Sequence, residues 1–353
     1  MTAQTTKLDE SSVLPAEPPR RPRTLLAMDP TLAPSLLDEC ALRRLSRVAE
    51  VAPGLVVDDF SQADALAALR DTEVLLTSWG CPPLDAEVLA AAPRLRAVVH
   101  AAGSVKWHVT EACWDRGIQV TSAADANAVP VAEYTVAAVL ASNKRLLEVW
   151  DTYRRIRDEH DWRAAYPQVG NYRRTVGLIG ASRTGRLVID LLRPYALKVV
   201  VHDPYLSTDE AAALGVQSLT LDELCQTSDV ISVHAPETPE TRHMIDRRRL
   251  GLMRDGVTFI NTARGSLVDQ QALTEELVTG RLHAVLDVTE PEVLPADSPL
   301  YDLPNVLLTP HFAGSFGNEL ARMGDLAVDE VTRYAAGLPF THAVHREELD
   351  HTA

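Results

Sequence analysis

Polar side chains capable of acid–base chemistry follow four short apolar runs in the second half of the chain. We predict buried strands at Val230–Val233, Val257–Asn261, Val285–Asp287 and Val306–Thr309, and the polar residues that follow or end them are His234–Pro236, Asn261–Gly265, Asp287–Glu292 and Thr309–His311. The carboxyl ends of parallel strands meet at one edge of a sheet, where ligands bind. We therefore expect Arg264, an acid of the third group and His311 to converge at that edge.

An arginine, a carboxylate and a histidine together suit the reduction of a 2-oxo acid. The planar arginine fork binds a carboxylate or polarises a ketone. The histidine donates a proton as hydride reaches the carbonyl carbon, and the carboxylate orients the imidazole and favours its protonated form. Taken singly, each residue also has an ordinary interpretation as a solvated surface group.

The stretch from Thr175 to Tyr205 predicts a βαβ unit that binds a dinucleotide. Gly180 permits a sharp turn after the first strand, Gly185 permits close packing of helix on strand, and the first helical N–H groups would face a pyrophosphate. Ser182 replaces the middle glycine of G-x-G-x-x-G with another small residue. Asp203 ends the second strand, where it would bind ribose hydroxyls and favour NAD over NADP. The alternatives are an ordinary strand-to-helix turn and a serine-hydrolase elbow, and the elbow pattern is one residue out of register.

Composition and charge exclude several other classes. A chain of 353 residues is long enough for two domains, and its net charge of −15 disfavours nucleic acid and anionic membranes as partners. The four cysteines show neither metal spacing nor a disulfide framework, which suits a reducing cytoplasm. No apolar run approaches the ~20 residues of a membrane helix, and the start lacks a signal-peptide pattern. We expect the polar, proline-rich residues 1–22 to be a disordered tail.

The first half of the chain alternates between predicted strands and helices, which is typical of an α/β fold. The strands are Thr24–Met28, Val74–Thr77, Ala97–His100 and Ile118–Thr121, and the helices lie near Pro34–Ala49, Ala63–Leu69, Asp85–Ala91 and Val109–Asp115. A long, mostly apolar helix, Ala126–Trp150, then leads out of this domain. Its surplus apolar surface would be buried against a second subunit or within the chain, and both interpretations stay open.

Four separated motifs resemble the D-isomer-specific 2-hydroxyacid dehydrogenase family, including its phosphoglycerate, glyoxylate and hydroxypyruvate reductase-like members. They are HAPETPETRHMI (His234–Ile245), INTARGSLVDQQAL (Ile260–Leu273), LDVTEPEVLP (Leu286–Pro295) and NVLLTPHFAGS (Asn305–Ser315). The resemblance implies Arg264 as the substrate-binding arginine, His311 as the acid/base and Glu292 as its carboxylate partner, with Glu290 as the fallback. It also implies NAD contacts at Arg183, Thr184, Asp203, Pro236, Thr241, Thr262, Ala263 and Asp287.

The substrate loop departs from the family pattern. The family has a glycine-rich loop followed by Asp-Asn, whereas this chain reads AAGSVKWHV (Ala101–Val109). Gly103 and Ser104 fall where backbone N–H groups would hold the substrate carboxylate, and Lys106 and Trp107 replace the Asp-Asn pair. These two side chains either line the substrate pocket or only pack the loop. Farther on, Asn127 and Glu133 match positions at the start of the connecting helix.

We therefore predict a two-domain α/β protein. The resemblance implies a flavodoxin-like substrate domain formed by residues 23–126 and 312–353, and a Rossmann-type NAD-binding domain at 127–311. The predicted activity is reversible, NAD-dependent reduction of a small 2-oxo acid to the D-2-hydroxy acid by a cytoplasmic homodimer without a metal. The alternatives are an NADH-sensing, co-repressor-like binding protein and a dehydrogenase of phosphite or another small anion.

Overall fold

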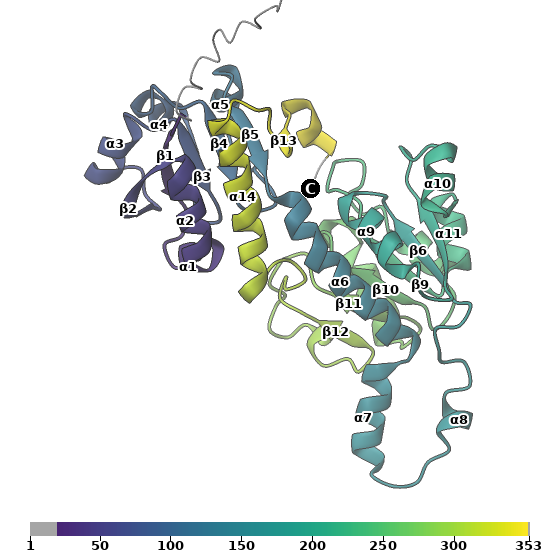
Figure 1. Cartoon of the computed structure of the whole chain (residues 1–353). Helices are drawn as coiled ribbons and strands as arrows, with labels where there is room; N and C mark the ends of the chain where they lie inside the picture. Colours follow the sequence, from purple (N-terminus) through teal and green to yellow (C-terminus); the bar gives the residue numbers. More distant parts are fainter. Residues whose placement is uncertain (1–19, 352–353) are drawn as a thin grey trace, which may run out of the picture.

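The computed structural model describes residues 20–351, which form two mainly parallel sheets joined by one long helix (Figure 1). The first sheet has the order β13 (Ala343–Val344), β5 (Gln119–Ser122), β4 (Ala97–His100), β3 (Val74–Thr77), β1 (Arg23–Ala27) and β2 (Glu50–Val57). All its strand pairs are parallel except β13 with β5. The last strand of the chain therefore returns to the sheet of the N-terminal half.

The second sheet contains seven parallel strands. Its order is β12 (Val306–Leu308), β11 (His283–Leu286), β10 (Thr258–Asn261), β9 (Val230–Val233), β6 (Thr175–Ile179), β7 (Lys198–His202) and β8 (Gln217–Ser218). The register aligns the last residues of five neighbouring strands, namely Ile179, Val233, Asn261, Leu286 and Leu308. The residues that follow these strands consequently emerge at one edge.

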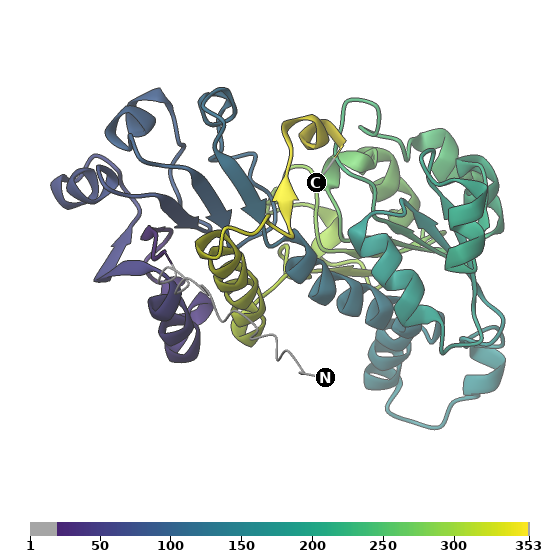
Figure 2. The ribbon, with the colours of Figure 1, turned by 45° about the horizontal axis from the view of Figure 1, so that its top comes forward.

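Helices cover both faces of each sheet, so each sheet has an apolar core on either side (Figure 2). The first sheet carries α1 (Ala33–Leu36), α2 (Glu39–Val48), α3 (Ala63–Leu69), α4 (Ala86–Ala91), α5 (Glu111–Asp115) and α14 (Leu320–Ala335). The second carries α9 (Arg183–Leu192), α10 (Thr208–Leu214), α11 (Leu221–Thr227), α12 (Arg247–Leu252) and α13 (Gln270–Val278). Short 3-10 turns are η1 (Gly265–Leu267), η2 (Pro299–Tyr301), η3 (Gly317–Glu319) and η4 (Arg346–His351). This arrangement confirms the predicted two-domain α/β class.

Helix α14 attaches the C-terminal part of the chain to the first domain. It packs against α1, α2 and β4, and Arg44 on α2 forms ion pairs with Asp325 and Asp329 on α14. This packing agrees with a discontinuous first domain, whose boundaries at 126 and 312 remain a prediction.

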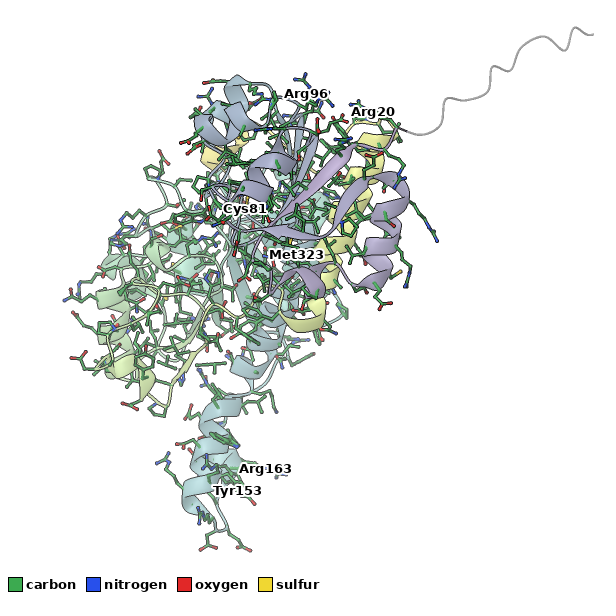
Figure 3. The ribbon with its side chains drawn as sticks, turned by 90° about the vertical axis from the view of Figure 1, so that its left-hand side faces the viewer. Arg20, Cys81, Arg96, Tyr153, Arg163 and Met323 are labelled. Atoms are coloured by element: carbon green, nitrogen blue, oxygen red, sulfur yellow. The ribbon has the colours of Figure 1, made fainter. Side chains whose placement is uncertain are left out.

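The long helix predicted over Ala126–Trp150 is two helices in the structure. Helix α6 (Ala124–Asn143) packs on α9, contacts β9 and β10 of the second sheet and contacts α14 of the first domain, whereas α7 (Leu146–Ile156) has no buried residue. Between them Arg145 adopts a left-handed conformation, φ 51°. Its guanidinium donates hydrogen bonds to Thr258 Oγ1, at 3.1 Å, and to the carbonyl of Gly256. The break directs α7 and the short α8 (Trp162–Ala165) away from both domains (Figures 1 and 3).

The sequence analysis did not predict strand β2 because its residues lack a clear apolar pattern. Pro53 and Gly54 interrupt the strand, and most of its side chains are exposed or half-buried at the edge of the sheet. Of the expected tail, residues 1–19 lie outside the described residues. Arg21 is held against the first domain, since its guanidinium donates hydrogen bonds to the carbonyls of Ser46 and Ala49 at 2.6 and 2.9 Å.

Candidate active site

A cavity of about 780 Å³ lies between the two domains, at the carboxyl ends of both sheets. It is lined from the first domain by residues after β3 and β4, from α6 by Ala124, Asn127, Ala128 and Val131, and from the second domain by residues after β6, β9, β10 and β11. Eleven residues expected from the sequence line it: Gly103, Ser104, Ser182, Arg183, Thr184, Pro236, Thr262, Ala263, Arg264, Asp287 and His311. Expected site residues that do not line it are Lys106, Gly180, Gly185, Asp203, Thr241 and Glu292.

The turn between β6 and α9 has the geometry of a diphosphate cradle. Gly180 has φ 102°, and a Cβ there would lie 2.8 Å from the backbone nitrogen of Ala235. A Cβ on Gly185 would lie 2.2 Å from the carbonyl oxygen of Gly180. Both positions therefore require glycine, and their small size lets the N-terminus of α9 approach the cavity. Ser182 caps this helix, because its hydroxyl accepts a hydrogen bond from the N–H of Gly185 at 3.3 Å.

The Asp203 carboxylate stabilises this turn through hydrogen bonds to backbone N–H groups. One carboxylate oxygen accepts a hydrogen bond from the N–H of Ala181 at 2.7 Å, and the other accepts one from the N–H of Tyr205 at 2.8 Å. Thr241 has a similar role in the loop after β9, since its hydroxyl donates to the carbonyl of Pro236 at 2.7 Å. These two predicted cofactor residues therefore shape the backbone around the cavity.

Arg264 presents an unneutralised guanidinium to the cavity. It follows β10, is half-buried, and forms no ion pair with any residue from 20 to 351. Its Nη1 donates only to the neighbouring carbonyl of Ala263, at 2.7 Å. A half-buried cation without a carboxylate partner is suited to binding an anionic ligand.

His311 and Glu292 form a hydrogen-bonded pair at the same edge. Nδ1 of His311 lies 2.6 Å from Oε1 of Glu292, and because a carboxylate only accepts, Nδ1 carries the proton. Nε2 of His311 has no hydrogen-bond partner among the described residues, so it is free for a ligand. Glu290 instead contacts Arg242 at 2.8 Å and His243 at 3.3 Å. Arg242 holds the pKa of the Glu290 carboxyl below its usual value.

The buried carboxylate of Asp287 fixes the loop that carries His311. It accepts hydrogen bonds from Thr309 Oγ1 at 2.6 Å, from the N–H of Phe312 at 2.6 Å and from the N–H of Ala313 at 2.9 Å. His311 itself has a positive φ of 54° and donates its N–H to the carbonyl of Asp287 at 2.7 Å. Several hydrogen bonds therefore hold the loop in place around His311, whose backbone conformation is uncommon for histidine.

Arg183 is engaged with the first turn of α6. Its Nε lies 2.8 Å from Oδ1 of Asp125, and Oδ2 of the same carboxylate lies 2.7 Å from Nδ1 of His342. Asp125 thus connects the second domain, the joining helix and the C-terminal segment. Asn127, one turn along α6, accepts a hydrogen bond from the N–H of Ser315 at 2.9 Å and lines the cavity.

In the substrate loop, Gly103, Ser104 and Trp107 line the cavity and Lys106 does not. Other residues of the first domain that line the cavity were not expected from the sequence: Ser78, Trp79, Gly80 and Cys81 after β3, His100 at the end of β4, and His108 farther along the loop. The strand-end rule used for the second half of the chain would have found them, because Thr77 and His100 end two predicted strands of the first half.

The fold and the cavity define a two-domain α/β protein with a dinucleotide-type turn facing a cleft. A family model described as D-isomer specific 2-hydroxyacid dehydrogenase, NAD binding domain, matches residues 136–313. The chain belongs to the D-isomer specific 2-hydroxyacid dehydrogenase family, and its second domain carries the NAD-binding part. These findings confirm the resemblance and the expected cofactor.

Individual relatives agree with this family. D-3-phosphoglycerate dehydrogenase of Mycobacterium tuberculosis is 36% identical over 285 residues, which cover 80% of this chain and 52% of that protein. Glyoxylate reductase of Korarchaeum cryptofilum is 33% identical over 290 residues, covering 80% of this chain and 83% of that protein. The solved structure of D-lactate dehydrogenase from Aquifex aeolicus, complexed with NAD and lactic acid, has a TM-score of 0.68 and 28% identity, and covers 89% of this chain and 96% of that one. This chain spans about half the length of the phosphoglycerate dehydrogenases that it matches.

None of the helices described between residues 20 and 351 is both long and apolar enough to cross a membrane. The same part of the chain contains no cluster of His, Cys, Asp and Glu able to hold a metal ion.

Proposed function

We propose that the protein catalyses the NAD-dependent interconversion of a 2-oxo acid and the corresponding D-2-hydroxy acid. The observation that carries this proposal is the meeting of two groups in one cavity: the unneutralised Arg264 guanidinium and the His311 imidazole, whose Nδ1 is held by Glu292. The D configuration and the use of NAD come from the family to which the chain belongs.

The residues around the β6–α9 turn fit a dinucleotide. Gly180, Ser182 and Gly185 allow a diphosphate to approach the N-terminus of α9, with Arg183 and Thr184 on the same helical turn. The same side of the cavity also contains Pro236, Thr262, Ala263 and Asp287, as well as His311. NADH bound there supplies the hydride.

Three groups hold and protonate the substrate. The backbone N–H groups of Gly103 and Ser104 and the guanidinium of Arg264 bind the carboxylate, and Arg264 also polarises the ketone. His311 donates a proton from Nε2 to the ketone oxygen, while Glu292 stabilises the charged ring. In the reverse direction His311 accepts the hydroxyl proton at the same atom.

We also propose that the protein is a homodimer formed through α7. This helix has no buried residue, and it exposes Leu146, Leu147, Trp150, Tyr153 and Ile156. Figure 3 shows Tyr153 on this projecting segment, far from the first domain. A second copy of the chain would cover the apolar surface that α7 leaves exposed.

The activity is tested by mixing the protein with NADH and each of glyoxylate, hydroxypyruvate, pyruvate and bulkier 2-oxo acids. NADH absorbance should decay with at least one of them, and the product should be the D-2-hydroxy acid. NADH binding without turnover of any member would contradict the proposal and favour an NADH-binding sensor on the same fold.

A further inference from the structure

The wall of the cavity formed by the first domain carries no formal charge. It consists of Ser78, Trp79, Gly80, Cys81, His100, Gly103, Ser104, Trp107 and His108. This wall contains no lysine, arginine, aspartate or glutamate. Burial raises the pKa of the Cys81 thiol to about 12, so the thiol is uncharged near pH 7. Lys106 belongs to the same loop but lies outside the cavity lining. A substrate that binds its carboxylate at Arg264 and Gly103 would present its side chain to this uncharged wall.

The two histidines of this wall form one buried polar cluster with Thr77. The Thr77 hydroxyl lies 2.9 Å from Nδ1 of His100 and 3.2 Å from Nε2 of His108, and the two ring centroids are 4.3 Å apart. Burial lowers the pKa of both rings, that of His108 to about 4. Both imidazoles are therefore neutral near pH 7 and cannot replace a cation.

The Thr77 hydroxyl contacts one nitrogen of each ring. A hydroxyl can both donate and accept, so it can join two neutral imidazoles. Nδ1 of His108 takes no part in this contact.

Nδ1 of His108 has no hydrogen-bond partner within residues 20–351. The His108 side chain is almost fully buried and lines the cavity, so a ligand in the cavity would lie beside this ring.

Two indole rings stand on the same wall. Trp79 is 42% exposed and Trp107 is 88% exposed, and both line the cavity. Large exposed rings beside a binding site gain free energy when an aromatic or apolar group packs on them. Together they favour a flat apolar side chain, and the nearby His108 ring favours a hydrogen-bonding group at its end.

We propose that the substrate is a 2-oxo acid with an uncharged aromatic side chain whose distal hydroxyl or N–H forms a hydrogen bond with Nδ1 of His108. This inference rests on the proposed function and specifies its substrate class. It separates the chain from the phosphoglycerate dehydrogenases to which it is similar, because a phosphate dianion would face a wall without a cation.

The experiment compares kcat/KM for 4-hydroxyphenylpyruvate, phenylpyruvate, 3-phosphohydroxypyruvate and pyruvate. We expect both aromatic acids to exceed the phosphorylated acid, and the hydroxyl to add about tenfold over phenylpyruvate, the value of one buried hydrogen bond. In His108→Phe the ratio of the two aromatic acids should fall to about one. The exposed His345 lies outside the cavity lining, and His345→Phe should keep the wild-type ratio.

A second variant and a binding measurement keep the test decisive if His108→Phe does not fold. Trp107→Ala changes an exposed ring and should raise KM for both aromatic acids about tenfold or more. The dissociation constant of 4-hydroxyphenyl-D-lactate from the protein saturated with NADH should rise in parallel. A wild-type preference for 3-phosphohydroxypyruvate, or an unchanged ratio in folded His108→Phe, would overturn the inference. Turnover of glyoxylate or hydroxypyruvate but of neither aromatic acid would also overturn the inference, whereas turnover of no 2-oxo acid at all would contradict the proposed function.

Discussion

His311 combines an uncommon backbone conformation with one engaged and one free ring nitrogen. Its φ of 54° is maintained by the hydrogen bonds that Asp287 makes to the surrounding loop. Nδ1 is engaged by Glu292. A histidine held in this way presents Nε2 to the cavity in a single orientation, which a proton donor requires.

The pairing of His311 with Glu292 predicts different effects for two neighbouring glutamates. Glu292→Gln should lower kcat for oxo-acid reduction about tenfold, because a charge-assisted hydrogen bond is about twice as strong as a neutral one.

Glu290→Gln is the matched control. Glu290 contacts Arg242 and His243 and not His311, so this variant should keep the wild-type kcat. Equal effects of the two substitutions on kcat would contradict the assigned pair.

At the residue scale, the sequence predicted which residues line the cavity better than it predicted their contacts. Motif position favoured Glu292, yet only coordinates show that Glu290 faces Arg242 instead. His108 was not identified because its role depends on Thr77, 31 residues away in the chain. Short-range patterns do not contain such a contact, since it arises from the parallel pairing of β3 with β4.

At the scale of elements, the β6–α9 turn requires glycine at position 185. In Gly185→Ala the new methyl group would meet the Gly180 carbonyl at 2.2 Å, so helix and strand must separate. We expect NADH affinity to fall at least tenfold and the unfolding free energy to drop by about 1–3 kcal/mol. NADH titration and urea unfolding measure the two effects.

Gly251→Ala in α12 is the corresponding control. A Cβ at Gly251 meets no atom within 4 Å, and alanine is a better helix former than glycine by about 1 kcal/mol. This variant should bind NADH normally and be equally or more stable. Unchanged NADH affinity in Gly185→Ala would contradict the proposed cradle.

The predicted strands and helices were most accurate where an apolar run coincided with a buried strand. Val74–Thr77, Ala97–His100, Thr175–Ile179 and Lys198–His202 agree with the structure at both ends. The helix predicted over Ala126–Trp150 was wrong near its C-terminal end, because the break at Arg145 depends on hydrogen bonds to residues more than a hundred positions away. Local helix propensity does not contain that information.

At the scale of the whole molecule, the exposed apolar side chains of α7 predict that the protein is a dimer. Trp150→Asp with Tyr153→Asp places two charges on the apolar face of α7 and should convert a dimer into a monomer by sedimentation equilibrium. Leu338→Asp changes a similarly exposed apolar residue after α14 and should leave the dimer intact. A wild-type protein that is monomeric at micromolar concentration would contradict the proposed interface.

The buried, neutral histidines predict that the unfolding free energy of the protein decreases at acid pH. Burial lowers the pKa of His108, His234 and His283 to about 4 and that of His100 well below its usual value. The unfolded chain therefore binds more protons, and stability is lost as pH falls from about 6.5 toward 4. Between pH 7 and pH 5 each ring should cost on the order of 1–2 kcal/mol.

Urea unfolding at fixed protein concentration measures this dependence. Removing one ring, in His234→Gln, should reduce the pH slope of the unfolding free energy by up to one proton. A slope that equals that of the wild type would contradict a neutral, buried His234.

The sequence predicted the two-domain class, the family and the cofactor, whereas the domain boundaries, the cytoplasmic location and the dimer stay predictions. The cleft itself was not derivable from local pattern, because it arises where two separately formed sheets meet across α6 (Figure 2).

The central claim is that Arg264 and His311 act on one substrate beside a bound nicotinamide. The most direct test incubates the protein with a 2-oxo acid and NADH deuterated at the transferable position of C4, and analyses the product by mass spectrometry. We predict one deuterium on C2 of a D-2-hydroxy acid, and a rate 10²–10⁴-fold lower in His311→Asn, which should tolerate the left-handed backbone and still bind NADH. Bound NADH with no label transferred to any 2-oxo acid, or a near-normal rate in His311→Asn, would contradict it.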